Sequence, residues 1–182
     1  MSKAYILFAE GFEVIEALAS VDVLHRAAVD IVKVAVGGSL DVGSSHGHVV
    51  VHCDALIESL SLDDGDALIL PGGNPGYINL RQSESVCSVV RDYMAQGRVV
   101  AAICGAPTVL AAAGVAHGSR VTCHSSVVEE MAAYSYVGGA VVEDGNLITG
   151  AGAGVSVEFA LAVAARLVGG EVMARTRRGM EL

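Results

Sequence analysis

A cysteine at the end of an apolar stretch is the most reactive side chain in the sequence. Val99-Val-Ala-Ala-Ile-Cys104 is followed by Gly-Ala-Pro-Thr108 and by an alanine-rich segment that ends at Gly114. This pattern predicts a buried strand, a tight turn and a helix, with Pro107 in the first helical turn and Gly114 as the C-terminal cap. A thiol at such a turn faces the positive end of the helix, which is expected to lower its pKa. The pattern is typical of a nucleophile elbow with cysteine in place of serine, although a buried structural cysteine gives a similar pattern.

Backbone N–H groups of three glycines can assist such a thiol. The predicted strand 66–70 stops at Pro71 and is followed by Gly72 and Gly73, while Gly105 comes directly after the cysteine. Glycine lets the backbone approach a ligand closely, so these three residues can point N–H groups at a developing oxyanion. Pro-Gly-Gly is also an ordinary turn signal.

An acid and an imidazole complete the set of candidate groups. Glu13 and Glu16 are one helical turn apart. We expect Glu13 to stabilise the positive start of its helix, and Glu16 to pack near Cys104, where burial makes a carboxyl hard to ionise. A neutral carboxylic acid donates a hydrogen bond to a thiolate. His124 ends the predicted strand 120–124 and can shuttle a proton, but no acid is placed to orient it, so no full triad is expected.

Two other patterns have a weaker chemical interpretation. His46, His48 and His52 alternate along a strand-like stretch beside Cys53, which predicts three imidazoles on one face and makes a metal site an alternative to an exposed strand. Gly150-Ala-Gly-Ala-Gly154 precedes a helix but lacks the Gly-Lys-Ser/Thr ending of a phosphate loop and the downstream acid of a dinucleotide site. We therefore expect no metal and no cofactor.

Composition limits the classes of function. The chain has 182 residues, 53% of them hydrophobic, and a formal net charge of −9. These values favour a single domain over residues 1–182 and argue against binding to nucleic acid. No apolar run reaches the roughly 18 residues of a membrane span. Four cysteines without a Cys-x-x-Cys pair, and no recognisable secretory signal, favour reduced thiols and a cytoplasmic location. The basic cluster Arg175, Arg177 and Arg178 is expected to be a solvated tail.

Hydrophobic periodicity predicts strands that alternate with helices. The expected strands are 4–9, 31–36, 49–51, 66–70, 99–104 and 120–124, with a hairpin over 140–149, and the expected helices are 13–28, 84–96, 107–113 and 155–168. This order indicates a doubly wound α/β sheet of flavodoxin-like type. Ligands bind such sheets beyond the carboxyl ends of the strands, where the thiol, the glycines, the acid and the imidazole converge.

Several of these segments together resemble the ThiJ/PfpI superfamily, and within it the Parkinsonism-associated deglycase branch. The segments are Glu10-Gly-Phe-Glu-Val-Ile-Glu16, Leu70-Pro-Gly-Gly-Asn74, Ala101-Ala-Ile-Cys-Gly-Ala-Pro107, His124 and Glu158-Phe-Ala-Leu161. The resemblance spans nearly the whole chain and implies a flavodoxin-like fold, usually a homodimer, with a strained, oxidisable elbow cysteine. It also implies roles for five residues: Cys104 as nucleophile, Glu16 as its protonated partner, Gly73 and Gly105 as backbone donors, and His124 as the nearby imidazole.

Three positions depart from the family pattern. Gly105 stands where the peptidase-like branch has histidine, which argues against a protease. The loop 150–154 lacks the arginine and proline usual in the deglycase branch, and His46 stands where an arginine often does. These two differences bear on substrate anchoring.

The resemblance implies a cysteine-dependent glyoxalase or deglycase. Such an enzyme acts on reactive dicarbonyls, such as methylglyoxal and glyoxal, or on their early glycation adducts, and releases a 2-hydroxy acid. The alternative is an oxidative-stress sensor or redox-regulated chaperone that works through oxidation of Cys104. A cysteine peptidase or amidase is the weaker alternative.

Overall fold

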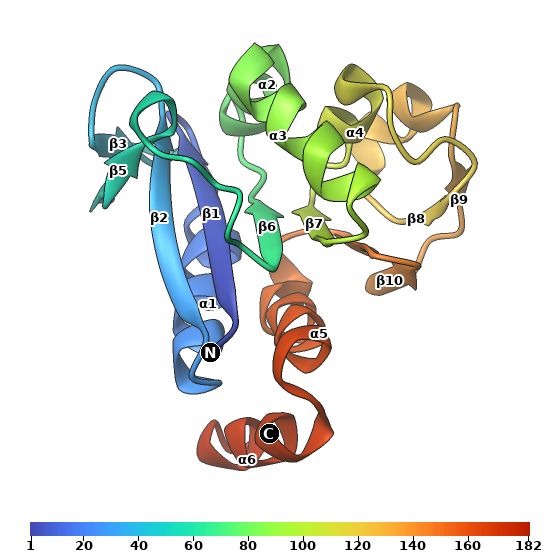
Figure 1. Ribbon diagram of the computed structural model, residues 1–182. Helices are drawn as coiled ribbons and strands as arrows, with labels where there is room; N and C mark the ends of the chain where they lie inside the picture. Colours follow the sequence, from blue (N-terminus) through green and yellow to red (C-terminus); the bar gives the residue numbers. More distant parts are fainter.

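A seven-stranded sheet runs through the centre of the computed structural model, which describes residues 1–182 (Figure 1). All neighbouring strands are parallel except for the hairpin at one edge. Across the sheet the strands lie in the order β10 (Val141–Asp144), β11 (Leu147–Gly150), β7 (Val99–Ile103), β6 (Ala67–Leu70), β1 (Lys3–Ala9), β2 (Asp30–Val36) and β5 (Ala55–Leu56). The predicted α/β architecture with a mostly parallel sheet is confirmed.

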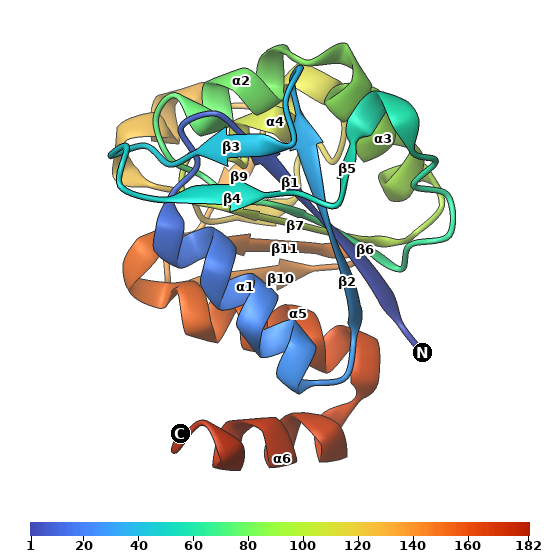
Figure 2. The ribbon, with the colours of Figure 1, turned by 90° about the vertical axis from the view of Figure 1, so that its left-hand side faces the viewer.

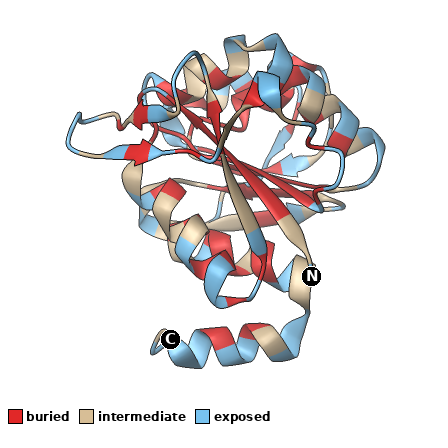
Figure 3. Cartoon of the chain, turned by 60° about the vertical axis from the view of Figure 1, so that its left-hand side comes forward, coloured by how far each residue is buried: buried red, intermediate tan, exposed pale blue.

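Helices cover both faces of this sheet (Figure 2). One face carries α1 (Val14–Arg26) and α5 (Ser156–Val168), and the other carries α2 (Gly76–Gln82), α3 (Glu84–Ala95) and α4 (Thr108–Ala113). Strand β1 is apolar throughout because both of its faces are buried. Ala4, Ile6 and Phe8 pack in the core on the side of α1 and α5, while Tyr5, Leu7 and Ala9 pack in the core on the side of α3 and α4. The buried residues appear as a continuous layer along the sheet in Figure 3.

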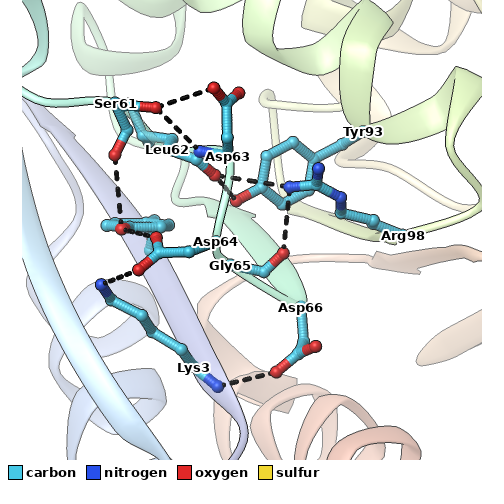
Figure 4. A network of polar contacts seen from close by, with 10 residues as sticks. Lys3, Ser61, Leu62, Asp63, Asp64, Gly65, Asp66, Tyr93 and Arg98 are labelled. Atoms are coloured by element: carbon cyan, nitrogen blue, oxygen red, sulfur yellow. Dashed lines mark hydrogen bonds and ion pairs between the residues drawn. The ribbon is translucent and has the colours of Figure 1, made fainter.

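A polar network closes the end of the sheet where β1 and β6 begin (Figure 4). Lys3 Nζ contacts Asp64 Oδ2 at 2.7 Å, and the Lys3 backbone N–H donates to Asp66 Oδ2 at 2.9 Å. Tyr5 donates its hydroxyl to Asp64, and Arg98 donates to the Gly65 carbonyl. These bonds fix the loop before β6 at the edge opposite the carboxyl ends of the strands.

Several elements differ from the sequence-based predictions. The predicted strand 49–51 is β4 (Val50–His52), which pairs with β3 (Asp41–Gly43) in a separate hairpin. The predicted strand 120–124 shortens to β8 (Arg120–Val121), which pairs with β9 (Ser135–Tyr136) outside the main sheet. Helix α2 was not predicted, because Pro75-Gly76 at its start is typical of a turn.

The arginine cluster lies on a helix and not on a tail. Helix α6 (Gly170–Gly179) packs against α5 and is set apart from the sheet (Figure 2). It buries Met173 and Thr176, while the cluster arginines face solvent. This helix was not predicted, because Gly169, Gly170 and Gly179 at its ends are unfavourable for a helix. None of the helices combines the length and the apolar character needed to cross a lipid bilayer.

Candidate active site

The predicted nucleophile elbow is present at Cys104, between β7 and α4. Cys104 has a φ of 65°, in the left-handed region that non-glycine residues avoid. Two backbone hydrogen bonds hold it there: its N–H donates to the Gly150 carbonyl at 2.9 Å, and its carbonyl accepts from the His124 N–H at 2.8 Å. Such strain costs about 1–3 kcal/mol and persists where surrounding structure imposes it, as at reactive sites. As predicted, Gly114 caps α4 at its C-terminus, with a φ of 71°.

Glu16 lies beside this thiol, fully buried in the first turn of α1. The helix starts where it does because the Glu13 carboxylate accepts a hydrogen bond from the Glu16 N–H at 2.7 Å, as expected of a residue at the helix start. Glu16 Oε2 accepts from the Gly72 N–H at 2.8 Å, and the carboxyl also interacts with the Cys104 side chain. Its other oxygen, Oε1, is buried without a hydrogen-bond partner. Burial raises the pKa of Glu16 to about 7, so the acid is held near the point of protonation at neutral pH.

Gly72 holds the acid in place and does not face the pocket as an oxyanion donor. Its N–H is occupied by Glu16, which corrects the expectation that it would serve a substrate oxyanion. A Cβ at this position would lie 2.7 Å from Cys104 Cβ and 2.7 Å from Glu16 Oε2. Glycine is therefore required here to let the acid and the thiol approach each other.

The other two glycines point backbone N–H groups at the sulfur. The N–H groups of Gly73 and Gly105 lie near the Cys104 side chain and favour its ionised form. Gly73 has a φ of 94°, and a Cβ there would lie 2.3 Å from the Glu13 nitrogen, so no other residue fits. N–H groups in this place can stabilise a negative charge on the sulfur, or on an oxygen of a bound molecule whose carbon is bonded to the sulfur.

The pKa of the Cys104 thiol is raised and not lowered as the sequence suggested. Burial has the largest effect, and the neighbouring Glu16 carboxylate also opposes a thiolate, while the N–H groups of Gly105 and Gly73 act in the other direction. Together they raise the pKa of Cys104 to about 12. The pKa of Glu16 is therefore lower than that of Cys104, and an ionised Glu16 carboxylate can accept a proton from the thiol.

His124 lies three residues after β8, directly before the 3-10 helix Ser125–Met131, and not at the end of a strand next to Cys104. It shares with Cys104 a pocket of 160 Å³, lined by Gly73, Asn74, Tyr77, Cys104, Gly105, His124 and Ser126. Its Nδ1 accepts from the Ser126 N–H at 3.2 Å and lies 2.8 Å from Ser126 Oγ. A neutral His124 therefore carries its proton on Nε2. Ser126, and not an acidic side chain, orients the imidazole of His124.

Three residues of this pocket were missed from sequence. Asn74 directly follows Gly73, so its place in the quoted segment was an available signal. Ser126 lies two residues after His124, the spacing at which a side chain at the start of a helical turn accepts a backbone N–H, and here the His124 side chain accepts the Ser126 N–H. Tyr77 had no signal, because the helix that carries it was not predicted.

The histidine pattern at 46–52 does not form the predicted face. His46 and His48 lie in the turn between β3 and β4, and only His52 is in a strand, where it pairs with Asp41 at 2.6 Å. No group of three His, Cys, Asp or Glu side chains is arranged to hold a metal ion. Cys53 is buried, and burial raises its pKa to about 11. Gly150, the first glycine of the glycine-rich segment and the last residue of β11, instead supports the elbow by accepting the Cys104 N–H.

Fold and site together define an α/β protein with a cysteine elbow at the carboxyl edge of its sheet. The family model described as the DJ-1/PfpI family matches residues 2–166, and the chain belongs to this family. It is 35% identical over 178 residues to the Parkinson disease protein 7 homolog of Danio rerio, covering 96% of this chain and 94% of that one. It is 32% identical over 173 residues to the glutathione-independent glyoxalase DJR-1.2 of Caenorhabditis elegans, covering 93% and 90%. Among solved structures, Drosophila melanogaster DJ-1beta superposes with a TM-score of 0.96 at 36% identity, covering 100% of this chain and 99% of that one.

Proposed function

We propose that the protein is a cysteine-dependent glyoxalase that converts methylglyoxal or glyoxal, free or in early glycation adducts, to a 2-hydroxy acid. The observation that carries the proposal is the pairing of a strained thiol, which lines a small pocket, with a fully buried acid beside it whose pKa is about 7. An acid or base with a pKa near the working pH is the most effective proton carrier. The relative named as a glutathione-independent glyoxalase supports the choice of substrate class.

The first step is addition of the thiol to the aldehyde. Cys104 Sγ bonds to the aldehyde carbon as its proton passes to the Glu16 carboxylate, and the carbonyl oxygen, protonated in turn, becomes the hydroxyl of a hemithioacetal. The N–H groups of Gly73 and Gly105 stabilise the negative charge on that oxygen. The thiol is the covalent handle, so the step uses no metal or organic cofactor.

The second step moves one proton between adjacent carbons. Glu16 removes the proton from the carbon that bears sulfur, giving an enediolate, and returns it to the neighbouring carbon. The hydroxyl proton of the hemithioacetal passes to the former ketone oxygen, so that the carbon bonded to sulfur becomes the thioester carbonyl. The product is a thioester of a 2-hydroxy acid, at the same oxidation level as the hemithioacetal. Water then cleaves the thioester, regenerating the thiol and releasing lactate from methylglyoxal or glycolate from glyoxal. His124, on the pocket wall, is placed to activate this water.

Lactate formation from methylglyoxal tests the proposal directly. Cys104→Ala should reduce turnover by about 10³-fold or more, as loss of a covalent nucleophile does in other enzymes. Cys87→Ala is the matched control, because this cysteine is buried in α3 away from the pocket and should leave turnover unchanged. Equal turnover by wild type and Cys104→Ala would contradict the mechanism.

Redox sensing through Cys104, with or without chaperone activity, is the second candidate function. Cys104 is the one cysteine that is not buried, and the N–H groups of Gly73 and Gly105 can hold the oxygens of a sulfinate. After mild peroxide, peptide mass spectrometry should find two added oxygens on Cys104. Oxidation that falls first on Cys53, Cys87 or Cys123 would contradict this use. Peptide or amide hydrolysis has less support, since Ser126 and not a carboxylate orients His124.

We also infer a cytoplasmic homodimer. The four cysteines are free, in keeping with a reducing compartment. Ile15 of α1 is 55% exposed beside a surface hollow of 530 Å³ between α1, α5 and the C-terminus, an apolar area that a second copy would cover. Sedimentation at micromolar concentration tests the dimer, and Ile15→Glu should shift the protein to monomer.

A further inference from the structure

Tyr77 is the only large apolar side chain that lines the Cys104 pocket. It lies in the first turn of α2, where its N–H donates to the Gly73 carbonyl at 2.8 Å. The other lining residues are small, backbone-exposing or polar. One wall of the pocket is thus the phenol ring of Tyr77, and the helix that carries it is hydrogen-bonded to Gly73.

The ring of Tyr77 lies against Gly105 so closely that only glycine fits there. A Cβ at position 105 would lie 2.6 Å from Cδ1, 2.7 Å from Cγ and 2.9 Å from Cε1 of the tyrosine. Gly105 does not have a left-handed φ, so its backbone conformation does not demand glycine. The Tyr77 ring explains why residue 105 is glycine, because the ring leaves no room for a side chain there.

A cation fixes the ring from the same helix. The Arg81 guanidinium carbon lies 5.4 Å from the centre of the Tyr77 ring, and Arg81 forms an ion pair with Glu130. Arg81 is one helical turn after Tyr77, so its side chain covers the tyrosine. Contacts with both Gly105 and Arg81 restrict rotation of the ring away from the pocket.

Resting on the proposed function, we propose that Tyr77 sets the upper size limit of the substrate. The pocket of 160 Å³ is smaller than the roughly 300 Å³ or more of sites for drug-sized ligands. It admits a dicarbonyl with a hydrogen or methyl substituent, and the ring blocks an aryl substituent on the carbon next to the aldehyde. Tyr77 is a specificity-determining residue and takes no part in the proton transfers.

The ratio of kcat/KM for phenylglyoxal to that for methylglyoxal tests this role. Tyr77→Ala and Tyr77→Leu should each raise the ratio by about tenfold or more, the scale of discrimination that a filled apolar pocket provides. Tyr77→Phe keeps the ring and should keep the wild-type ratio, as should Tyr136→Ala, which removes an exposed tyrosine of β9. A wild-type ratio in both Tyr77→Ala and Tyr77→Leu, or a raised ratio in Tyr77→Phe, would overturn the proposal.

Alkylation of Cys104 separates this proposal from the proposed function. Rates with iodoacetamide and with its N-benzyl derivative are followed on the Cys104 peptide, and their ratio should shift toward the bulky reagent in Tyr77→Ala whether or not the protein turns over dicarbonyls. Gly105→Ala alone should slow both reagents, and adding Tyr77→Ala should restore the rates, because the added methyl then has room. A shifted alkylation ratio without any turnover of dicarbonyls would contradict the glyoxalase proposal and support the role of Tyr77 in limiting substrate size. Turnover of dicarbonyls with unchanged ratios would support the glyoxalase proposal and contradict the role of Tyr77.

Discussion

Glu16 and Cys104 meet across Gly72, which is close enough to both that a single added methyl group would collide with each of them. The N–H of the same glycine holds the Glu16 carboxyl. The distance between acid and nucleophile is thus set by the backbone at the end of β6.

Gly72→Ala should therefore separate Glu16 from Cys104. The added methyl has contacts of 2.7 Å on two sides, and overpacking of this kind destabilises a protein by about 1–3 kcal/mol. We expect a lower free energy of unfolding in urea and loss of lactate formation. Gly38→Ala is the control, since nothing lies within 4 Å of a Cβ at that position. Full activity of Gly72→Ala would show that the pair tolerates displacement.

Glu16→Gln should change the pH dependence of stability in a defined direction. Folding raises the pKa of Glu16 from 4.5 to about 7, chiefly through burial. A raised carboxyl pKa means that the folded state favours the neutral form, so wild-type stability declines as pH rises from about 4.5 to about 7 and is then constant. The shift corresponds to about 3 kcal/mol. The stability of Glu16→Gln relative to wild type should therefore increase by up to this amount between pH 4 and pH 8, as measured by urea unfolding. A pH-independent difference would contradict a buried, neutral acid.

The same variant should react faster with alkylating agents while losing turnover. The Glu16 carboxylate helps to raise the pKa of Cys104 to about 12, so its removal lowers the thiol pKa and increases the thiolate fraction at pH 8–9. Iodoacetamide labelling of Cys104 against pH measures this effect. Slower labelling together with lost turnover would indicate that Glu16 activates the thiol and does not act mainly as a proton carrier.

The strain at the elbow predicts an order of stability among Cys104 variants. The φ of 65° is unfavourable for alanine and favourable for glycine. Cys104→Gly should be more stable than Cys104→Ala by about 1 kcal/mol, after the greater flexibility of glycine in the unfolded chain is taken into account. Thermal unfolding of the two inactive variants checks this. Equal stability would mean that the turn relaxes when the thiol is removed.

The residue types and their spacing predict which groups meet at the site but not their pKa values. Cys104, Glu16 and Gly73 were found because parallel strands end at one edge, a rule that needs only strand order. The direction of the Cys104 pKa was wrong, because it depends on how much water the folded chain excludes and on a carboxylate 88 positions away in the chain. Tyr77 was missed because it gains its role from a tertiary contact with Gly105, whereas Ser126 contacts His124 only two residues away and could have been found from its spacing. His124 was expected at the end of a strand 120–124, but it lies three residues beyond the short strand β8, which leaves little hydrophobic pattern.

The backbone bond between the Cys104 carbonyl and the His124 N–H has an evolutionary consequence. It ties the imidazole-bearing turn to the elbow through main-chain atoms, which no substitution other than proline removes. Side chains around the pocket are then free to diverge while the spacing between nucleophile and imidazole is inherited unchanged. A scaffold of this kind can acquire new substrates by altering a wall residue such as Tyr77, without rebuilding its reactive centre.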